Sequence, residues 1–270
     1  MTAIIPAAGK GTRFLPATRV IPKEMLPIGA KPAIHCIVEE ALAAGADDIV
    51  LVISEEKEII RRYFDGDETL AGKVRYVYQR EQRGLGHAVL QAAEGVTGTA
   101  LVLLGDALVT GPNPSREMVA ISKANDGASV IGLERVPPER VSRYGIAKVE
   151  CKMKNVKCKM EGAQNLCEKP NSAFYILNST FSIVDLVEKP KQEEAPSDLA
   201  IAGRYLLSAD IFGLLATQTP GHGGEIQLTD AIRRLLATQA VFGYVYPGKR
   251  QDIGNPQGYL KALEAFNGIG

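Results

Sequence analysis

The chain carries a glycine-rich turn directly after a short apolar run near its N-terminus. Residues 7–18 read AAGKGTRFLPAT. Gly9 and Gly11 would let the backbone approach a ligand closely and would expose successive N–H groups to an anion. Arg13 adds a guanidinium that can bind a phosphate through two hydrogen bonds. The turn therefore favours a phosphate or nucleotide site over a purely structural turn.

This turn matches neither of the two most common phosphate-binding motifs. The pattern G-x-x-x-x-G-K-[ST] is absent from the sequence. The pattern G-x-G-x-x-G is also unmet, because the third residue after Gly11 is Phe14. The sequence thus argues against a nicotinamide dinucleotide site.

A single acid, Asp106, follows the apolar run ALVLL at 100–104. A carboxylate at the C-terminal end of a buried strand is well placed to hold a hard cation or a hydroxyl group of a ligand. The alternative is that Asp106 caps a helix that begins there.

The cysteines invite a metal-binding interpretation, but their spacing does not support one. Cys151, Cys158 and Cys167 are spaced as C-x6-C and C-x8-C, without a C-x2-C pair or a nearby histidine. With Cys36, they are better interpreted as reduced structural thiols. No signal peptide is predicted from the N-terminal residues, so a cytoplasmic location is expected.

The overall composition excludes several other classes of function. Lys and Arg total 31, and Asp and Glu also total 31, so the formal net charge is zero and a nucleic-acid partner is not expected. The sequence has no apolar run long enough for a transmembrane helix, so no membrane partner is expected either.

The elements that must position these residues alternate between strand and helix in the first half of the chain. Apolar runs predict strands, and apolar residues at helical spacing predict helices between them. This alternation indicates a parallel, doubly wound sheet. The expected strands are 2–7, 48–53, 74–78 and 100–104, and the expected helices are 33–46, 55–64 and 85–94.

From about residue 128 the pattern becomes mainly strand-like. Strands are expected at 129–136, 144–152, 181–190, 199–207 and 241–248, and helices at 225–239 and 256–266. The polar stretch 150–182 has little periodicity and is interpreted as an insertion. The predicted fold class is α/β: a Rossmann-like, doubly wound, mostly parallel but mixed sheet with a small β-rich insertion and C-terminal helices.

Residues 9–34, GKGTRFLPATRVIPKEMLPIGAKPAI, closely resemble the N-terminal signature of the sugar nucleotidylyltransferases, G-x-G-T-R…P-K-x-[ML]-[LM]-P…K-P. The stretches FLPAT and IPKEMLP within it are most similar to those of the bacterial UTP–glucose-1-phosphate uridylyltransferases. The segments 82–92, 186–212 and 223–232 also resemble this family, in the same order along the chain.

The resemblance implies transfer of a uridylyl group from UTP to glucose 1-phosphate, giving UDP-glucose and pyrophosphate, with Mg²⁺ as cofactor and a homodimer or homotetramer as assembly. Two alternatives stay open. The chain could instead be a thymidylyl- or cytidylyltransferase for glucose 1-phosphate, or a non-catalytic regulatory homologue.

The resemblance also implies roles for residues on the nucleotide side. Arg13 and Lys23, the lysine of PKEMLP, would be catalytic, and Asp106 and Asp252 would hold the metal. The nucleotide would be bound by Ala8, Gly9, Gly11, Thr12, Gln79 and Gly84. Gln82 is a rival to Gln79 for contact with the base, because either amide offers both a donor and an acceptor.

On the sugar side, the motif E-K-P occurs twice, and only one copy is expected to act. Glu188 and Lys189 are followed by continuous family-like sequence, whereas Glu168 and Lys169 are not. The sugar phosphate would be bound by Gly145, Glu188, Lys189 and Gly203. Within one domain, 1–270, segment 1–127 would bind the nucleotide, 128–222 would bind the sugar phosphate, and the C-terminal helical segment 223–270 would complete the metal site.

Overall fold

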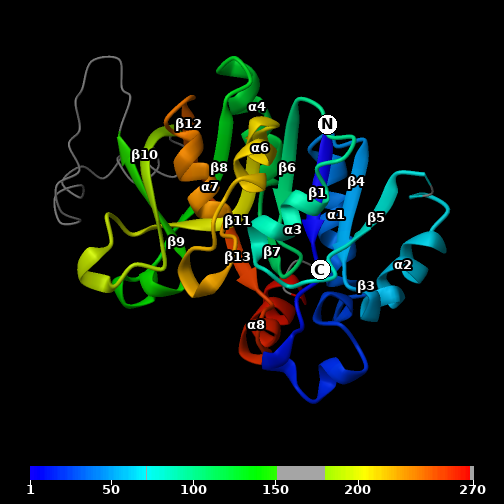
Figure 1. Cartoon of the computed structure of the whole chain (residues 1–270). Coiled ribbons are helices and arrows are strands. Elements are labelled where there is room, and N and C mark those ends of the chain that lie inside the picture. The colour runs from blue at the N-terminus through cyan, green and yellow to red at the C-terminus, as the bar shows by residue number, and fades with distance from the viewer. Residues whose placement is uncertain (71, 151–179, 268–270) are drawn as a thin grey trace.

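A nine-stranded mixed sheet runs through the molecule (Figure 1). The structure is a computed structural model that describes residues 1–70, 72–150 and 180–267. In chain order, the strands of this sheet are β1 (Thr2–Pro6), β4 (Asp48–Ile53), β5 (Val74–Tyr78), β6 (Thr99–Leu103), β8 (Ser129–Arg135), β9 (Gly145–Glu150), β10 (Thr180–Glu188), β11 (Leu199–Ser208) and β12 (Val241–Val245).

The strand order is β5-β4-β1-β6-β11-β8-β12-β10-β9. The first four strands are parallel to one another, whereas β11 pairs antiparallel with both β6 and β8. From β1 the chain steps outward to β4 and β5 and then returns to the other side of β1 at β6. This reversal leaves a crevice beyond the carboxyl ends of β1 and β6, which is where doubly wound sheets bind ligands.

Helices cover both faces of the sheet, so its central strands are apolar on both sides. On one face, α1 (Ala33–Ala43), α2 (Glu58–Asp65) and α4 (Pro114–Ala124) pack over one hydrophobic core. On the other face, α3 (Leu85–Gln91), α6 (Asp210–Ala216) and α7 (Leu228–Leu235) enclose a second core.

A second, two-stranded sheet brings the C-terminal segment to the end of β6. It pairs β7 (Ala107–Thr110) antiparallel with β13 (Lys249–Asp252) and sets Asp252 opposite Ala107. The chain then forms α8 (Pro256–Asn267), which lies beside the N-terminal segment (Figure 1). That segment contains the short hairpin of β2 (Pro27–Ile28) and β3 (Lys31–Pro32), where Tyr259 Oη donates a hydrogen bond to the Pro27 carbonyl at 2.8 Å.

The predicted α/β fold with a mixed sheet is confirmed, and each strand expected in the described ranges is present. The expected helix 55–64 is divided into a 3₁₀ turn (Glu55–Lys57) and α2. The structure adds α4, α6, β7 and β13, for which the sequence made no prediction. In the C-terminal segment 223–270, the expected strand 241–248 is present as β12, which lies between β8 and β10 in the main sheet, and β13 is an additional strand there.

Most of the expected insertion, together with Glu168, Lys169, Cys151, Cys158 and Cys167, lies outside the described residues. Cys36 is a free, half-buried thiol. Within the described part of the chain, no helix is both long and apolar enough to cross a lipid bilayer.

Candidate active site

The glycine-rich turn leaves the carboxyl end of β1 with its backbone exposed. Gly11 has φ of 64°, and a β-carbon there would lie 3.1 Å from Cγ2 of Thr18. The Thr18 hydroxyl donates a hydrogen bond to the Gly11 carbonyl at 2.9 Å, and this bond holds the two ends of the turn together. The next residues, Thr12–Phe14, form a 3₁₀ turn. The expected anion-binding backbone is therefore held in a conformation that glycine adopts readily.

A cavity of about 270 Å³ lies against one side of this turn. Four cationic side chains line it and only one carboxylate, Glu56, does so. This excess of positive charge suits a phosphate group. The cations are Lys10, Arg19, Lys23 and Lys57.

Lys23 forms an ion pair with Asp106 across the crevice. Burial acts to lower the pKa of Lys23, but the carboxylates of Asp106 and Glu24 outweigh burial, so the pKa is raised. Burial acts to raise the pKa of Asp106, but the Lys23 ammonium outweighs it, so that pKa is lowered. Both groups are therefore charged at neutral pH.

The two acids predicted to hold a metal lie close together, with Arg13 beside them. A β-carbon added at Gly254 would lie 2.8 Å from Oδ1 of Asp252, 3.4 Å from Oδ2 of Asp106 and 3.5 Å from Nη1 of Arg13. The alternative that Asp106 caps a helix is wrong, because the residue after it begins strand β7.

These two carboxylates fit the coordination preferences of Mg²⁺. Magnesium is usually held by one or two carboxylates, with substrate phosphates and water completing its shell. The described residues contain no group of three or more His, Cys, Asp or Glu side chains that could hold a metal ion alone. A metal at Asp106 and Asp252 would therefore need oxygen ligands from the substrate.

A buried ion pair that the sequence did not predict lies behind the glycine-rich turn. The Lys57 ammonium donates hydrogen bonds to Glu24 at 2.8 Å and to the Ala7 carbonyl at 2.6 Å. Lys57 is only 7% exposed and Glu24 only 2%. The pair joins the end of β1 to the turn that carries Lys23. No sequence signal distinguished Lys57 from the other charged residues of EEKE.

On the expected base-binding side, the structure places Gln79 beside Gly84 and Gln82 beside Ala8. Gln79 Nε2 donates a hydrogen bond to the Gly84 carbonyl at 3.3 Å. Gln82 Nε2 donates to the Ala8 carbonyl at 2.8 Å. Gly84 has φ of 105°, and a β-carbon there would lie 2.8 Å from the Ile226 carbonyl oxygen. Both amides therefore stay candidates for contact with the base.

Three of the four predicted sugar-phosphate residues lie together at the far edge of the sheet. Gly145 and Glu188 are directly opposite each other on β9 and β10. Lys189 follows with φ of 46°, and its ammonium is 3.6 Å from Oε1 of Glu188. Thr229, which the sequence did not single out, donates a hydrogen bond from its hydroxyl to Oε2 of Glu188 at 2.6 Å.

The fourth residue, Gly203, lies away from that group, in an irregular part of β11 between Ile201 and Tyr205. Its nearest side chains are those of Leu104 and Ala107, on either side of Asp106 along the chain. The neighbours of Gly203 are therefore residues beside Asp106, on the proposed metal side, rather than Glu188.

Arg250 is a second cation that the sequence did not predict. It lies on β13, two residues before Asp252, and its side chain is only 8% exposed. Its guanidinium pairs with Glu134 and lies 4.4 Å from the centre of the Tyr144 ring. Burial acts to lower the pKa of Arg250, but Glu134 outweighs it. The Arg250 guanidinium thus contacts Tyr144, the residue before Gly145, and Arg250 belongs to the same strand as Asp252.

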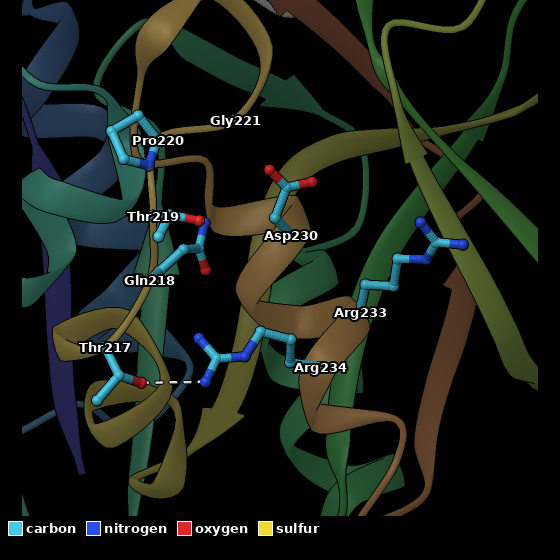
Figure 2. A pocket seen from close by; sticks show the side chains of 8 residues that line it. All are labelled: Thr217, Gln218, Thr219, Pro220, Gly221, Asp230, Arg233 and Arg234. Atoms are coloured by element: carbon cyan, nitrogen blue, oxygen red, sulfur yellow. Dashed lines mark hydrogen bonds between the residues drawn. The ribbon is translucent and has the colours of Figure 1, made fainter.

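Another cavity, of about 370 Å³, opens beside α7 (Figure 2). Its two arginines already have partners. Arg233 binds Asp185 at 2.7 Å, and Arg234 donates to the Thr217 hydroxyl at 3.0 Å. In Figure 2 the Asp230 carboxylate points toward the loop at Gly221 rather than toward these arginines. We therefore place the candidate site at the glycine-rich turn and not in this cavity.

Comparison with known proteins identifies the family to which the chain belongs. The family model described as nucleotidyl transferase matches residues 2–267. A UTP–glucose-1-phosphate uridylyltransferase of Staphylococcus saprophyticus is 42% identical, with 96% of this chain and 89% of that protein covered. A protein of the same name from Streptococcus pyogenes is 41% identical, with coverage of 96% and 86%.

Solved structures show the same similarity in three dimensions. A UDP-glucose pyrophosphorylase complexed with UDP-glucose has a TM-score of 0.83 and 35% identity, with 100% of this chain and 99% of that chain covered. A UTP-bound UGPase from Acinetobacter baumannii has a TM-score of 0.80 and 35% identity, with coverage of 100% and 94%. The family match across nearly the whole sequence, together with these relatives, shows that the chain belongs to the nucleotidyl transferase family.

Proposed function

We propose that this chain transfers the uridylyl group of UTP to glucose 1-phosphate and releases pyrophosphate. The observation that carries the proposal is the similarity to proteins of that name, about 40% identical over 96% of this chain. The arrangement of Arg13, Lys23, Asp106 and Asp252 around the crevice supports it, because two anionic substrates require neutralised charge and fixed geometry.

In the proposed reaction, an oxygen of the sugar phosphate attacks the α-phosphorus of UTP in line. A new P–O bond forms while the bond to the β-phosphate breaks, and pyrophosphate leaves with that electron pair. The attacking phosphate is already ionised, so no general base is needed. Arg13 and the amides of Gly11 and Thr12 would hold the triphosphate. Lys23 would place its ammonium at the phosphates near the reacting centre.

Asp106 and Asp252 would hold Mg²⁺. When bound, the metal compensates negative charge and helps to orient the α-phosphate. Arg13, beside both carboxylates, would limit the repulsion between them and the triphosphate.

The sugar phosphate would bind on the side of the site toward β9 and β10. Glu188 would accept hydrogen bonds from sugar hydroxyls, and Lys189 would bind the phosphate. Gly145 and Gly203 would let the sugar approach the backbone. This assignment divides the chain as the sequence predicted, with the nucleotide on 1–127, the sugar phosphate on 128–222, and Asp252 supplied by 223–270.

The base would be read by the residues that follow β1 and β5. Ala8, Gly9 and Gly84 would contribute backbone groups, and Gln79 would contribute its amide. Gln82, which binds the Ala8 carbonyl, is the rival for that contact.

A substrate panel tests the proposal. Pyrophosphate release is measured with UTP, dTTP and CTP, each with glucose 1-phosphate and Mg²⁺. UTP should give the highest kcat/KM. A preference for dTTP or CTP would assign the chain to a thymidylyl- or cytidylyltransferase. UTP binding without release of pyrophosphate from UTP, whichever sugar phosphate is added, would identify a regulatory homologue.

We also propose a homodimer or homotetramer. The N-terminal segment exposes Leu15, Val20 and Ile21, with exposed fractions of 54%, 81% and 43%. Apolar side chains gathered on one segment are typical of a protein contact. Light scattering after size-exclusion chromatography would give the assembly, and a monomer would overturn this part of the proposal. Cytoplasmic location stays a prediction.

A further inference from the structure

Arg204 on β11 carries a charge and is nevertheless fully buried in the molecule. Its Nε and Nη2 donate hydrogen bonds to the two carboxylate oxygens of Glu40 on α1, at 2.8 and 2.7 Å. The Arg204 side chain is 0% exposed, and that of Glu40 is 11% exposed. The ion pair therefore joins helix α1 to the main sheet.

The same guanidinium holds both ends of the turn that carries Asp106. Nη2 donates a hydrogen bond to the Ala107 carbonyl at 2.7 Å, and Nη1 donates to the Gly203 carbonyl at 3.1 Å. The Gly203 carbonyl also accepts a hydrogen bond from the Leu104 amide at 3.0 Å. The turn is thus fixed through Leu104 on one side of Asp106 and directly at Ala107 on the other.

Ala107 is also the point where the two proposed metal ligands meet. It directly follows Asp106 in the chain, and it is paired with Asp252 in the antiparallel ladder of β7 and β13. Beside this pair, the Ile253 amide donates a hydrogen bond to the Asp106 carbonyl at 2.9 Å. A shift of the Ala107 peptide would therefore move the backbone of both acids.

Stability alone is a poor explanation for this buried ion pair. The cost of removing two charges from water roughly cancels their attraction, and apolar residues of similar size often stabilise a core equally well. The carboxylate is nonetheless held in one orientation, because the buried Ser115 hydroxyl donates a hydrogen bond to Oε1 of Glu40 at 2.6 Å. What Arg204 supplies, and an apolar residue could not, is a donor for the Ala107 carbonyl.

We infer that Arg204 is a positioning residue that sets Asp106 and Asp252 for the binding of Mg²⁺ together with the nucleotide. This inference rests on the proposed function. Loss of the hydrogen bonds that hold metal ligands in place typically lowers metal affinity or activity by about 10- to 100-fold. Mg²⁺ is sensitive to such a loss because it demands nearly ideal octahedral geometry. Arg204 itself is too deeply buried to touch a substrate.

The contribution of the metal to nucleotide binding is the quantity that tests this role. Calorimetry gives the dissociation constant for UTP with Mg²⁺ in excess and again with EDTA, and the ratio of the two values measures that contribution. A disturbed fold would weaken UTP binding in both conditions and leave the ratio unchanged. Misplaced metal ligands would reduce the ratio itself.

Two variants remove the contact with Ala107 in different ways. Arg204→Lys keeps a positive charge beside Glu40, but an ammonium lacks the planar fork that reaches both carboxylate oxygens and the Ala107 carbonyl at once. The triple variant Arg204→Met, Glu40→Leu and Ser115→Ala replaces the whole polar cluster by apolar side chains, so that no charge of the pair is left without its partner. Ser115→Ala alone is the matched control, because it leaves the hydrogen bond from Arg204 to Ala107 intact.

We expect the ratio to fall by about tenfold in both Arg204 variants, while UTP affinity in EDTA and the KM for glucose 1-phosphate stay within about twofold of wild type. Ser115→Ala should keep the wild-type ratio. Arg204→Lys combined with Asp106→Asn should lower the ratio no further than Asp106→Asn alone, because the two changes act through the same ligand. A wild-type ratio in either folded Arg204 variant would overturn the inference, and so would an equal loss of UTP affinity with Mg²⁺ and with EDTA.

The remaining outcomes separate this inference from the proposed function. If Asp106→Asn reduces the ratio and the Arg204 variants do not, the role of Arg204 fails alone. If Mg²⁺ does not strengthen UTP binding to the wild-type protein, the proposed metal site fails and the inference fails with it. Failure of the wild-type protein to use UTP would defeat the proposed function itself. Thermal unfolding identifies any variant that is not folded, and Arg204→Lys, which retains the charge pair, decides the question if the triple variant does not fold.

Discussion

The Lys23 ammonium and the Asp106 carboxylate form an ion pair that joins the turn after the glycine-rich loop to the end of β6. The two residues are 83 positions apart in the chain. Their contact spans the crevice between β1 and β6, where the strand order reverses. A cation of the proposed triphosphate site and an acid of the proposed metal site are thus in direct contact.

We predict that Lys23→Ala lowers kcat by about 10²- to 10³-fold and weakens UTP binding much less. The ammonium should matter most when negative charge redistributes in the transition state. Steady-state kinetics and UTP titration would measure the two effects. Lys10→Ala, an exposed lysine of the same cavity, is the control and should lose far less turnover. Equal losses of kcat and UTP affinity would contradict the role of Lys23.

Removal of the metal should abolish turnover, and Mg²⁺ should restore it. Asp106→Asn and Asp252→Asn should each raise the Mg²⁺ concentration for half-maximal activity by about tenfold or more, because each removes one anionic oxygen ligand. Asp126→Asn is a suitable control, since Asp126 is exposed and its positive φ of 54° suits asparagine equally well. A wild-type Mg²⁺ requirement in both site variants would exclude them as ligands.

Lys189→Ala should raise the KM for glucose 1-phosphate by about tenfold or more, because it removes the ammonium proposed to bind the sugar's phosphate. Lys191→Ala, two residues further on and 72% exposed, should change this KM little. Lys169→Ala, in the other E-K-P copy, should also have little effect. If Lys169→Ala had the larger effect, the first copy would be the working one.

Thr229→Val should raise the KM for glucose 1-phosphate several-fold with a smaller change in kcat. The substitution keeps the shape of the side chain but removes the hydrogen bond to Oε2 of Glu188. Without that hydrogen bond, the Glu188 carboxylate is no longer held in one orientation toward the sugar. Thr229→Ser keeps the hydroxyl and should restore the wild-type KM. A serine variant as impaired as the valine variant would show that the methyl group matters and the hydrogen bond does not.

Glu24→Gln should lower the free energy of unfolding by about 3–5 kcal/mol, because it leaves the buried Lys57 ammonium without a charged partner. Urea denaturation would measure the loss. The double variant Glu24→Gln with Lys57→Met removes both charges and should recover much of the stability. Activity should be low in the double variant even so, because the hydrogen bond from the Lys57 ammonium to the Ala7 carbonyl is absent. Recovery of full activity would assign the pair a purely structural role.

The local sequence was sufficient to predict the parallel strands and the glycine-rich turn. Residues 49–53 of β4 are all apolar, as expected for a strand covered on both faces. The predicted bounds of β4 and β5 agree with the structure. Asp106 was predicted as a site residue because it lies just beyond the end of such a run, after Gly105. Strand β13 was not predicted, since KRQD has no apolar periodicity and forms a strand only by pairing with β7.

The sequence by itself therefore determined the α/β fold class, the family resemblance and most of the candidate residues, because short-range patterns and motifs carry that information. Only the tertiary structure decided which side chains meet. Glu24 and Lys57 are 33 residues apart, and Glu188 and Thr229 are 41 apart. Such contacts depend on how strands pair and helices pack over the sheet, and no local pattern encodes the distance between two side chains that the fold brings together.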